Sequence, residues 1–477
     1  MIIQIQFFLN PSGTTLEKLK TMKKYKFKIK LLCLCLVSIS FSQKILIPMD
    51  QTQNDHLKSY GIAYYALKRN INVEWLLNFQ GGSFLIDSQS SIKAECKIRG
   101  VTFIEINDEV LEIYSNIEKN NMDIVLLEKA PKIAIYTPPN KQPWDDAVTL
   151  ALTYAEVDYE TLWDEEVLNN GLDDFDWLHL HHEDFTGQYG KFYRNYHNAP
   201  WYIDQKNRFE SLAKKYGMAS VHEEKKTIAK IIKNYISNGG FLFAMCSATD
   251  SYDIALSLEG VDGVHSVFDG TPVDKNLSNK IDFSKTLVFK DFSLYTDPMV
   301  YEFSDIDYPP SHNPVTRGAE ADYFSLFEFS AKYDPVPTML TQNHVPVVKG
   351  FMGQTTGFNK NMIKNHVTIM GEDPASEQAK YLHGNLGKGT YTFYGGHDPE
   401  DYQHFVGDPP TDLSLHRNSP GYRLILNNIL FPAAKKKEKK KLENNFVLER
   451  IYQMSKKVEP LSIAINTTTN RTANGIS

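Results

Sequence analysis

The sequence predicts an α/β protein built on mainly parallel sheets, with two domains in the body of the chain. Apolar runs rich in β-branched residues alternate with stretches of helical periodicity through most of the sequence, which is typical of strands joined by helices. The length of 477 residues, with 42% hydrophobic and 23% charged side chains, fits a globular protein and argues against a fibre or a membrane bundle. A chain of this length is expected to form two domains.

The first, smaller α/β domain is expected over residues 43–130. Its strands are short and apolar, and its helices repeat apolar residues every three or four positions. In chain order its predicted elements are strand 45–48, a helix with Leu57, Tyr60, Tyr64 and Leu67 on one face, strands 73–77, 84–86 and 101–106, and helix 108–121. Residues 128–131, which end in a proline, predict a linker.

The second domain is expected over residues 131–434, with a long aromatic insertion at 262–340. Its order of strand, helix, strand, strand, helix and strand leads directly to Cys246. In chain order its predicted elements are strand 132–136, helix 147–155, strands 159–162 and 176–180, helix 223–237, and strands 241–245, 367–370 and 390–394. The glycine pair that ends helix 223–237 marks a clear boundary.

The N-terminal residues 22–42 have the pattern of a secretory signal peptide. A Lys-rich start precedes an apolar run at 31–39 that is too short to span a bilayer, and the small residues Ser40 and Ser42 precede a cleavage point before Gln43. We therefore expect translation to start at Met22, residues 1–21 to be a misassigned extension, and the mature protein to be periplasmic or secreted. Residues 435–477 are expected to be a basic and polar tail.

The charge distribution narrows the class of partner. The formal net charge is -7, but both ends are basic, so residues 44–434 alone carry a net charge of -19. An acidic body repels the phosphate backbone, which disfavours nucleic acid as a partner. We expect a small-molecule, peptide or carbohydrate partner, no membrane span in the mature protein, and no cofactor.

Cys246 is the first candidate for chemistry. It directly follows a predicted strand, where a helix N-terminus stabilises a thiolate and an oxyanion. His397 also directly follows a predicted strand and is the candidate base, with Asp398, Glu400 or Asp401 as the acid that orients it. An ordinary buried cysteine is the alternative interpretation.

Cys96, on the helical stretch 92–98, is expected not to be bonded to Cys246, although the compartment of an exported protein would permit a disulfide.

A metal site is the second candidate. His179 and His181 alternate on one face of a strand, and His182 turns to the other face. With His397 and His404 these residues offer nitrogen ligands suited to zinc. The alternative interpretation is a polar strand end beside a cleft.

Two segments resemble class I glutamine amidotransferase-like proteins. The run from Gly239 through Cys246 to Thr249 is similar to their nucleophile elbow, and the run from Gly389 through His397 to Glu400 is similar to their late strand with its His-Pro-Glu. The resemblance covers most of residues 131–432. It implies a flavodoxin-like three-layer sandwich and a triad of Cys246, His397 and Glu400 that cleaves an amide through a thioester.

Residues 44–434 as a whole resemble a group of exported Bacteroidetes proteins that carry the name asparagine synthetase B. The resembling runs are 45–50, 75–84 and 418–428. Asparagine synthetase B itself needs an N-terminal cysteine and a Ser-Gly-Gly-x-Asp-Ser loop, whereas this chain would mature at Gln43 and has no such loop. We therefore expect the name without that mechanism.

These features predict an exported, cysteine-dependent amide hydrolase or transferase. One alternative is a non-catalytic protein of the same fold that binds a carbohydrate or peptide. The other is a metal-dependent hydrolase centred on His179, His181 and His397.

Overall fold

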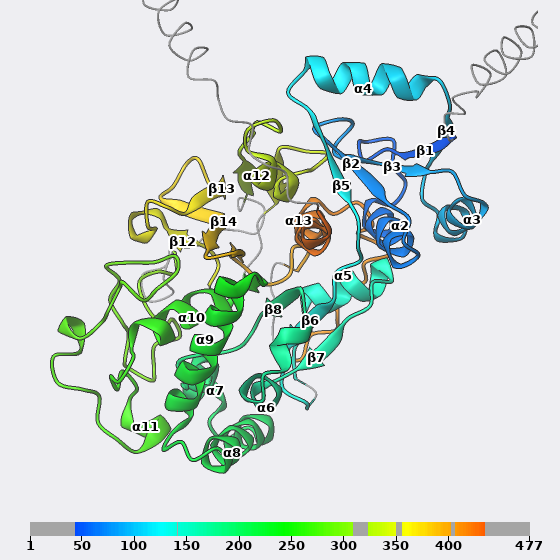
Figure 1. Cartoon of the computed structure of the whole chain (residues 1–477). Coiled ribbons are helices and arrows are strands. Elements are labelled where there is room, and N and C mark those ends of the chain that lie inside the picture. The colour runs from blue at the N-terminus through cyan, green and yellow to red at the C-terminus, as the bar shows by residue number, and fades with distance from the viewer. Residues whose placement is uncertain (1–42, 141, 309–322, 350–354, 402–405, 435–477) are drawn as a thin grey trace, which may run out of the picture. The chain divides into compact units, whose positions relative to one another are not determined.

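The computed structural model describes residues 43–140, 142–308, 323–349, 355–401 and 406–434 (Figure 1). The predicted extension at 1–21, the predicted signal peptide at 22–42, the tail at 435–477 and His404 lie outside the described residues. Among the described residues, no helix is both long enough and apolar enough to cross a membrane.

The first sheet is formed within the predicted N-terminal domain. Its strands are β1 (Lys44–Ile47), β2 (Val73–Leu77), β3 (Ser83–Asp87), β4 (Ile104–Ile106) and β5 (Asp123–Leu127). They are ordered β4-β1-β3-β2-β5, and every neighbouring pair is antiparallel. The helices of this region are α2 (His56–Lys68), α3 (Ser90–Arg99) and α4 (Glu109–Lys119). All of these elements except β5 match predicted ones.

The second sheet is larger and mixed. Its strands are β6 (Ile133–Tyr136), β7 (Glu160–Leu162), β8 (Trp177–Leu180), β9 (Phe241–Met245), β10 (Tyr323–Leu326), β11 (Val347–Lys349), β12 (Phe358–Asn359), β13 (Thr368–Glu372), β14 (Gln378–Leu386) and β15 (Gly389–Tyr394). The order is β11-β10-β13-β14-β15-β9-β8-β6-β7, with β12 beside β14. The pairs from β15 to β7 are parallel, and the pairs on the other side of β15 are antiparallel.

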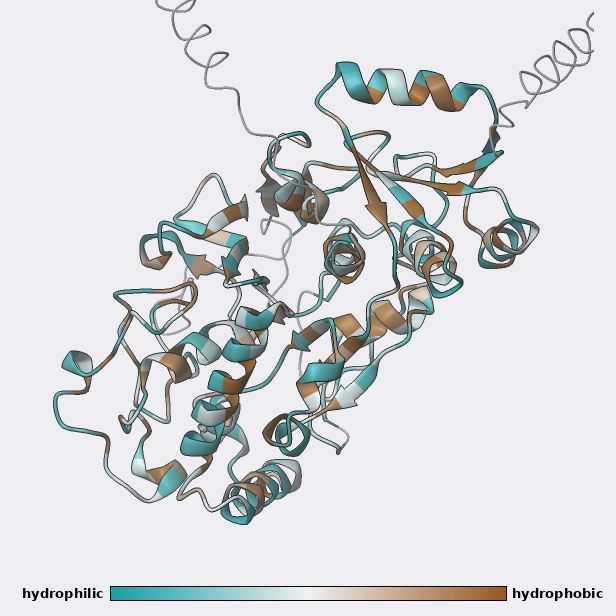
Figure 2. Cartoon of the chain, in the orientation of Figure 1, coloured by the Kyte–Doolittle hydropathy of each residue, from teal (hydrophilic) through white to brown (hydrophobic). Residues whose placement is uncertain are grey.

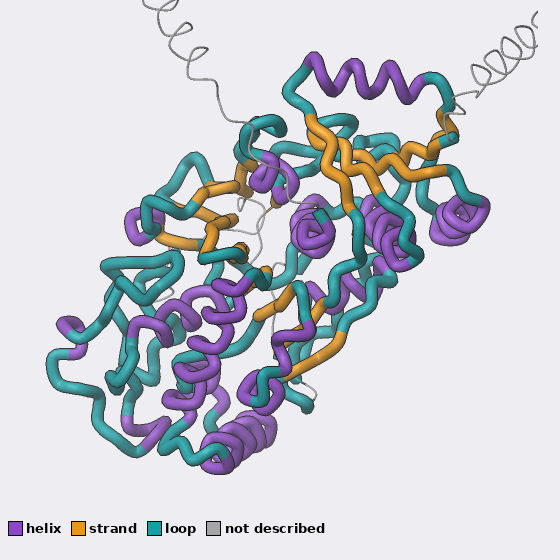
Figure 3. The backbone as a smooth tube through the Cα atoms, viewed as in Figure 1, coloured by secondary structure: helices purple, strands orange, loops and turns teal. Residues whose placement is uncertain are grey.

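The prediction of mainly parallel sheets is therefore wrong. The strands that lead to Cys246 are parallel, as expected, but the late strands return through tight connections and pair antiparallel. Only two residues, Gly387 and Lys388, lie between the paired ends of β14 and β15, so the connection is a hairpin and not a helical crossover. The expected insertion at 262–340 also supplies β10 to the sheet. Figure 3 shows that the described chain after α10, up to residue 308, is mostly loop.

Helices cover both faces of the parallel strands. Alternate residues of β9 divide between two cores, so Phe243 and Met245 face one and Leu242 and Ala244 face the other. The first face is covered by α5 (Ala147–Ala155) and α13 (Pro420–Leu430). The second face is covered by α8 (Pro200–Lys215), α9 (Val221–Asn238) and α10 (Ser247–Ser257). Figure 2 shows that α5 is largely apolar, as a buried helix should be. The remaining short helices are α6 (Asp164–Leu168), α7 (Tyr193–Tyr196), α11 (Ser266–Asp269) and α12 (Pro335–Leu340).

Helix α13 joins the late part of the chain to the first sheet. The fully buried Arg423 donates to the carbonyl oxygens of Met49 and Gly81, at 2.9 and 2.8 Å. One turn further along, Asn427 accepts a hydrogen bond from the Tyr60 hydroxyl at 2.5 Å. The two sheets consequently share one hydrophobic core through α2, α5 and α13.

Candidate active site

The candidate site lies where three neighbouring strands end. Strands β8, β9 and β15 are adjacent and parallel, so their carboxyl ends meet at one edge of the sheet. β8 leads into His181 and His182, β9 leads into Cys246, and β15 leads through two glycines into His397. Cys246 and His397 each follow a strand, as predicted, and the structure shows that these two strands, β9 and β15, are neighbours.

Cys246 occupies a strained turn between β9 and α10. Its backbone angles are φ 51° and ψ -141°, in a region that residues with a side chain rarely adopt. The turn is held at both sides, because the Cys246 N–H donates to Gly396 and the Ala248 N–H donates to the His181 carbonyl. A strained residue between a strand and a helix is the geometry of a nucleophile elbow. The adjacent Ser247 N–H lies in the first turn of α10, where no preceding helical turn supplies an acceptor.

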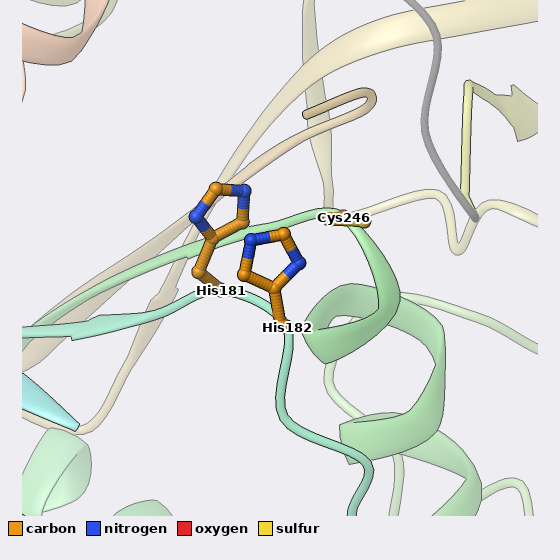
Figure 4. A group of neighbouring side chains, drawn as sticks. All are labelled: His181, His182 and Cys246. Carbon is orange, nitrogen blue, oxygen red and sulfur yellow. The ribbon is translucent and has the colours of Figure 1, made fainter. Parts of the chain in front are cut away.

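Three imidazoles gather beside this turn. The ring centroids of His181 and His182 are 3.8 Å apart. The ring centroid of His397 lies 4.5 Å from that of His181 and 4.3 Å from that of His182. The Nε2 atoms of His182 and His397 are 2.7 Å apart. The side chains of His181 and His182 each place a nitrogen within 4.8 Å of Cys246 Sγ and of each other (Figure 4). We call these four residues the His–Cys cluster.

Asp146 orients the cluster from the start of α5. Its Oδ1 accepts from the Thr149 N–H and so caps the helix, while its Oδ2 lies 2.8 Å from His181 Nδ1 and 3.2 Å from His179 Nε2. Burial alone would raise the pKa of Asp146, but His179 and His181 outweigh it and hold this pKa well below its usual range. An ionised Asp146 therefore fixes the proton of His181 on Nδ1 and leaves the lone pair on Nε2.

The predicted orienting acids lie in other surroundings. Glu400 Oε2 pairs with His416 Nδ1 at 3.2 Å, and the Glu400 N–H donates to Asp398 Oδ1. Asp398 is fully buried and Asp401 is partly exposed. The sequence analysis missed Asp146 as a partner of the site, although an aspartate directly before a predicted helix is a recognisable capping signal.

The thiol chemistry of the two described cysteines differs. Cys96 and Cys246 are not joined to each other, as predicted. Burial raises the pKa of the Cys96 thiol to about 12, which makes it a poor nucleophile at neutral pH. Cys96 lies in α3, outside the cluster.

An aromatic wall adjoins the cluster. Trp144 lies 5.5 Å from the His182 ring and packs against Phe192 and Trp201, at 5.3 and 5.6 Å between ring centroids. Tyr301, from the aromatic insertion, continues this wall at 6.2 Å from Phe192. Tyr301 is 40% exposed as a residue, and burial of its hydroxyl together with the nearby Cys246 raises its pKa. Partly exposed aromatic side chains are suited to stacking on a planar or sugar ligand.

A separate pocket of about 570 Å³ lies at the ends of β6 and β7. It is lined by polar groups of α6 and α8 together with Trp163. Its lining includes Glu166, Asp204, Asn207 and Arg208. A polar pocket with one aromatic side chain offers hydrogen bonds to a hydroxylated ligand.

Asp250 is a buried carboxyl one turn after Cys246. Its Oδ1 accepts from the Thr355 hydroxyl at 2.9 Å, and its Oδ2 has no hydrogen-bond partner among the described residues. Burial raises the pKa of Asp250 from 3.8 to about 7. The folded protein therefore favours the protonated form, and the stability contributed by this group is complete below pH 4 and is lost as pH rises through 7.

Asp250→Asn is expected to raise the free energy of unfolding at pH 8 by about 1–2 kcal/mol, because it removes a buried charge. The gain should be smaller at pH 5, where Asp250 is neutral in the folded protein but ionised in the unfolded chain, and it should vanish only below pH 4. Urea denaturation at the two pH values measures both effects. Asp253→Asn on the same helix is the control with the opposite sign, because Asp253 accepts three backbone N–H groups and its replacement should destabilise the protein at pH 8. A uniform loss of stability for Asp250→Asn at both pH values would contradict the assignment.

Comparisons with known proteins assign no family. No family model and no curated protein matches the chain. Solved structures that match include cytoplasmic proteins STM3548 and STM1381 from Salmonella typhimurium, each 11% identical, each covering 64% of this chain and 100% of its own, with TM-scores of 0.30 and 0.29. Gan42B, a GH42 β-galactosidase, is 10% identical over 56% of this chain and 28% of its own, with a TM-score of 0.24. Likenesses of this size leave the chain described only as an α/β protein with mixed sheets.

Proposed function

We propose that this protein is a cysteine-dependent hydrolase or transferase acting on an amide, with Cys246 as the nucleophile. The observation that supports this most strongly is the strained turn at Cys246, next to histidines of which one is anchored by Asp146. A thiol, a base and an acid that orients the base are the parts that nucleophilic catalysis by cysteine requires.

The proposed steps use groups of the His–Cys cluster. The Nε2 atom of His181 takes the thiol proton, and the Cys246 thiolate attacks the carbonyl carbon of the amide. The C–N bond breaks as the imidazolium returns the proton to the leaving amine, and a thioester remains on Cys246. The same imidazole then deprotonates water, which attacks the thioester carbonyl. The C–S bond breaks, the acid is released, and the imidazolium returns its proton to the Cys246 thiolate; an amine acceptor in place of water would give transfer. In this proposal the oxyanion is stabilised by the Ser247 N–H and the N-terminus of α10, which directly follow Cys246.

The finer parts of the proposal come from the sequence. We propose a class I glutamine amidotransferase-like fold, a relationship to the exported proteins named asparagine synthetase B, and a periplasmic or secreted location. Helices on both faces of the parallel strands are compatible with such a fold. The location is tested by N-terminal sequencing of native material, which should begin at Gln43; an intact Met22 would contradict export.

A second candidate function is binding without catalysis. The aromatic wall beside the cluster and the polar pocket at the ends of β6 and β7 favour a carbohydrate or peptide ligand. In that case the strained turn at Cys246 would serve only to shape the cleft.

Thiol alkylation in the presence of a chelator tests the nucleophile. Cys246 should react with iodoacetamide at pH 7 at least about 10-fold faster than Cys96, because an adjacent imidazole promotes the thiolate whereas burial suppresses it at Cys96. Peptide mass spectrometry measures each site in the same sample. Release of ammonia from glutamine and other amides would then be measured to identify the reaction. This activity should be lost in the Cys246→Ser variant. Equal labelling of the two cysteines would favour the binding function.

A further inference from the structure

We propose that His181, His182 and Cys246 form a binding site for a zinc ion, and that the bound ion withdraws the Cys246 thiolate from reaction. The first part concerns binding alone and stands without the proposed hydrolase. The second part rests on the proposed function, since it makes the metal a regulator of the same thiol.

The first argument is the spacing of the donor atoms. One donor atom from each of the three residues lies within 4.8 Å of the other two (Figure 4). Donors bound to one tetrahedral zinc ion at 2.0–2.3 Å lie roughly 3.3–3.8 Å from each other. Small side-chain rotations therefore suffice to bring the three donors onto one ion. Imidazole and thiolate together are the ligand types that zinc prefers.

The second argument is that both histidines are already oriented as ligands. His181 Nδ1 lies 2.8 Å from Asp146 Oδ2, and His182 Nε2 lies 2.8 Å from the Asp145 carbonyl. These acceptors place a proton on one nitrogen of each ring, so the lone pair is on His181 Nε2 and on His182 Nδ1. A histidine that donates its second N–H to a carboxylate or a backbone carbonyl is the usual arrangement around protein-bound zinc.

The third argument distinguishes this site from its neighbour. Asp146, His179 and His181 also bring three donor atoms together. Asp146 Oδ2 is only 2.8 Å from His181 Nδ1, closer than the roughly 3.3 Å expected of two donors on one tetrahedral ion, and a direct hydrogen bond accounts for it. His179 therefore supports Asp146 in orienting the site. Our proposal does not include His179 among the zinc ligands, whereas the metal site considered from the sequence did include it.

Binding changes the protonation of the thiol. Zinc binds the thiolate, so the Sγ–H bond of Cys246 breaks, its proton goes to solvent, and a Zn–S bond forms with no change in oxidation state. The sulfur electron pair that would attack an amide is then shared with the metal. With three protein ligands, the fourth position is left for water or another small ligand.

Cobalt(II) substitution in the full mature chain tests the binding. We expect an intense near-ultraviolet thiolate-to-cobalt band that one equivalent of zinc abolishes. Cys246→Ser should remove the band, and His182→Ala should weaken cobalt affinity by at least about 100-fold. Cys96→Ser is the matched thiol control and should keep the band. Absence of the band in the wild type, or its persistence in Cys246→Ser, would overturn the site.

Alkylation of the unmodified protein tests the consequence, and does not depend on a variant that folds. Zinc should slow iodoacetamide labelling of Cys246 by at least about 10-fold and leave Cys96 unaffected, and a chelator should restore the rate. A rate that zinc leaves unchanged would overturn the proposal. Fast labelling in chelator with no cobalt band would reject the metal site and leave the hydrolase standing. A cobalt band with slow labelling in chelator would reject the hydrolase and leave the metal site.

Discussion

His181→Ala is expected to slow alkylation of Cys246 at pH 7 by about 100-fold, measured in the presence of a chelator. The reason is that His181 is the imidazole anchored by Asp146, so its Nε2 lone pair is held beside the thiol. Losing it removes a base that Asp146 orients beside the thiol, and the thiolate fraction of Cys246 falls. Circular dichroism would show whether the variant keeps its fold, and the labelling rate of Cys96 gives an internal reference.

The neighbouring residues supply graded controls. Asp146→Asn should slow labelling by about 10-fold, because the amide no longer fixes the His181 tautomer as the carboxylate does. His397→Ala should slow it through His182, whose Nε2 it contacts at 2.7 Å. Glu400→Gln should have little effect, because Glu400 pairs with His416. A larger loss for Glu400→Gln than for Asp146→Asn would instead support the triad of Cys246, His397 and Glu400.

Lys225→Met is expected to lower the free energy of unfolding by about 3–5 kcal/mol at pH 7. Lys225 lies in α9 and is fully buried, with Nζ 2.8 Å from Asp164 Oδ2 and 3.0 Å from the Tyr136 hydroxyl. Burial opposes its charge, yet Asp164 and Glu183 keep the pKa of Lys225 above its usual value. Removing the cation leaves Asp164 as a buried charge without its partner, and chemical denaturation measures the loss.

A double-mutant cycle separates the ion pair from simple loss of packing. Lys225→Met combined with Asp164→Asn should be less destabilising than the sum of the single changes by at least about 1 kcal/mol, because the second change removes the stranded charge. Lys230→Met on the same helix is the matched control, since Lys230 pairs with Glu259 in solvent and should change stability by less than about 0.5 kcal/mol. Additive effects in the cycle would show that the pair contributes only packing.

Part of the fold could be predicted because some strands and helices are recognisable from their own residues and those directly beside them. Strand β9 is apolar throughout and is flanked by a glycine pair and a helix, so its place and length follow from local pattern alone. Strand β14 was missed because Gln378, Lys380 and His383 interrupt its pattern, although all three are buried. The Lys380 ammonium donates to the Thr356 carbonyl at 2.6 Å, which a sequence does not reveal. The direction of the late strands was also outside the reach of periodicity, which is the same for parallel and antiparallel pairs.

Some features of the candidate site could likewise be predicted from the local sequence, and others depend on tertiary contacts. That Cys246, His181 and His397 stand at strand ends could be predicted, because a strand end is a local property. That Asp146 would reach His181 depends on how the loop before α5 folds across the sheet edge, and this is a tertiary contact between residues 35 positions apart. The partner of Glu400 could not be predicted for the same reason, since His416 lies beyond the next loop.

The bonds from α13 to the first sheet have a consequence for how the chain is made. Arg423 and Asn427 contact residues that a ribosome synthesises first, and the Tyr60–Asn427 bond spans 367 positions. The nascent N-terminal strands therefore cannot complete their core until nearly all described residues have been translated. A chain whose first sheet waits for its last helix stays open longer, exposed to chaperones and proteases. Under the proposed export, the same delay would help, because a precursor that cannot finish folding early remains loose enough to be threaded through a secretion channel.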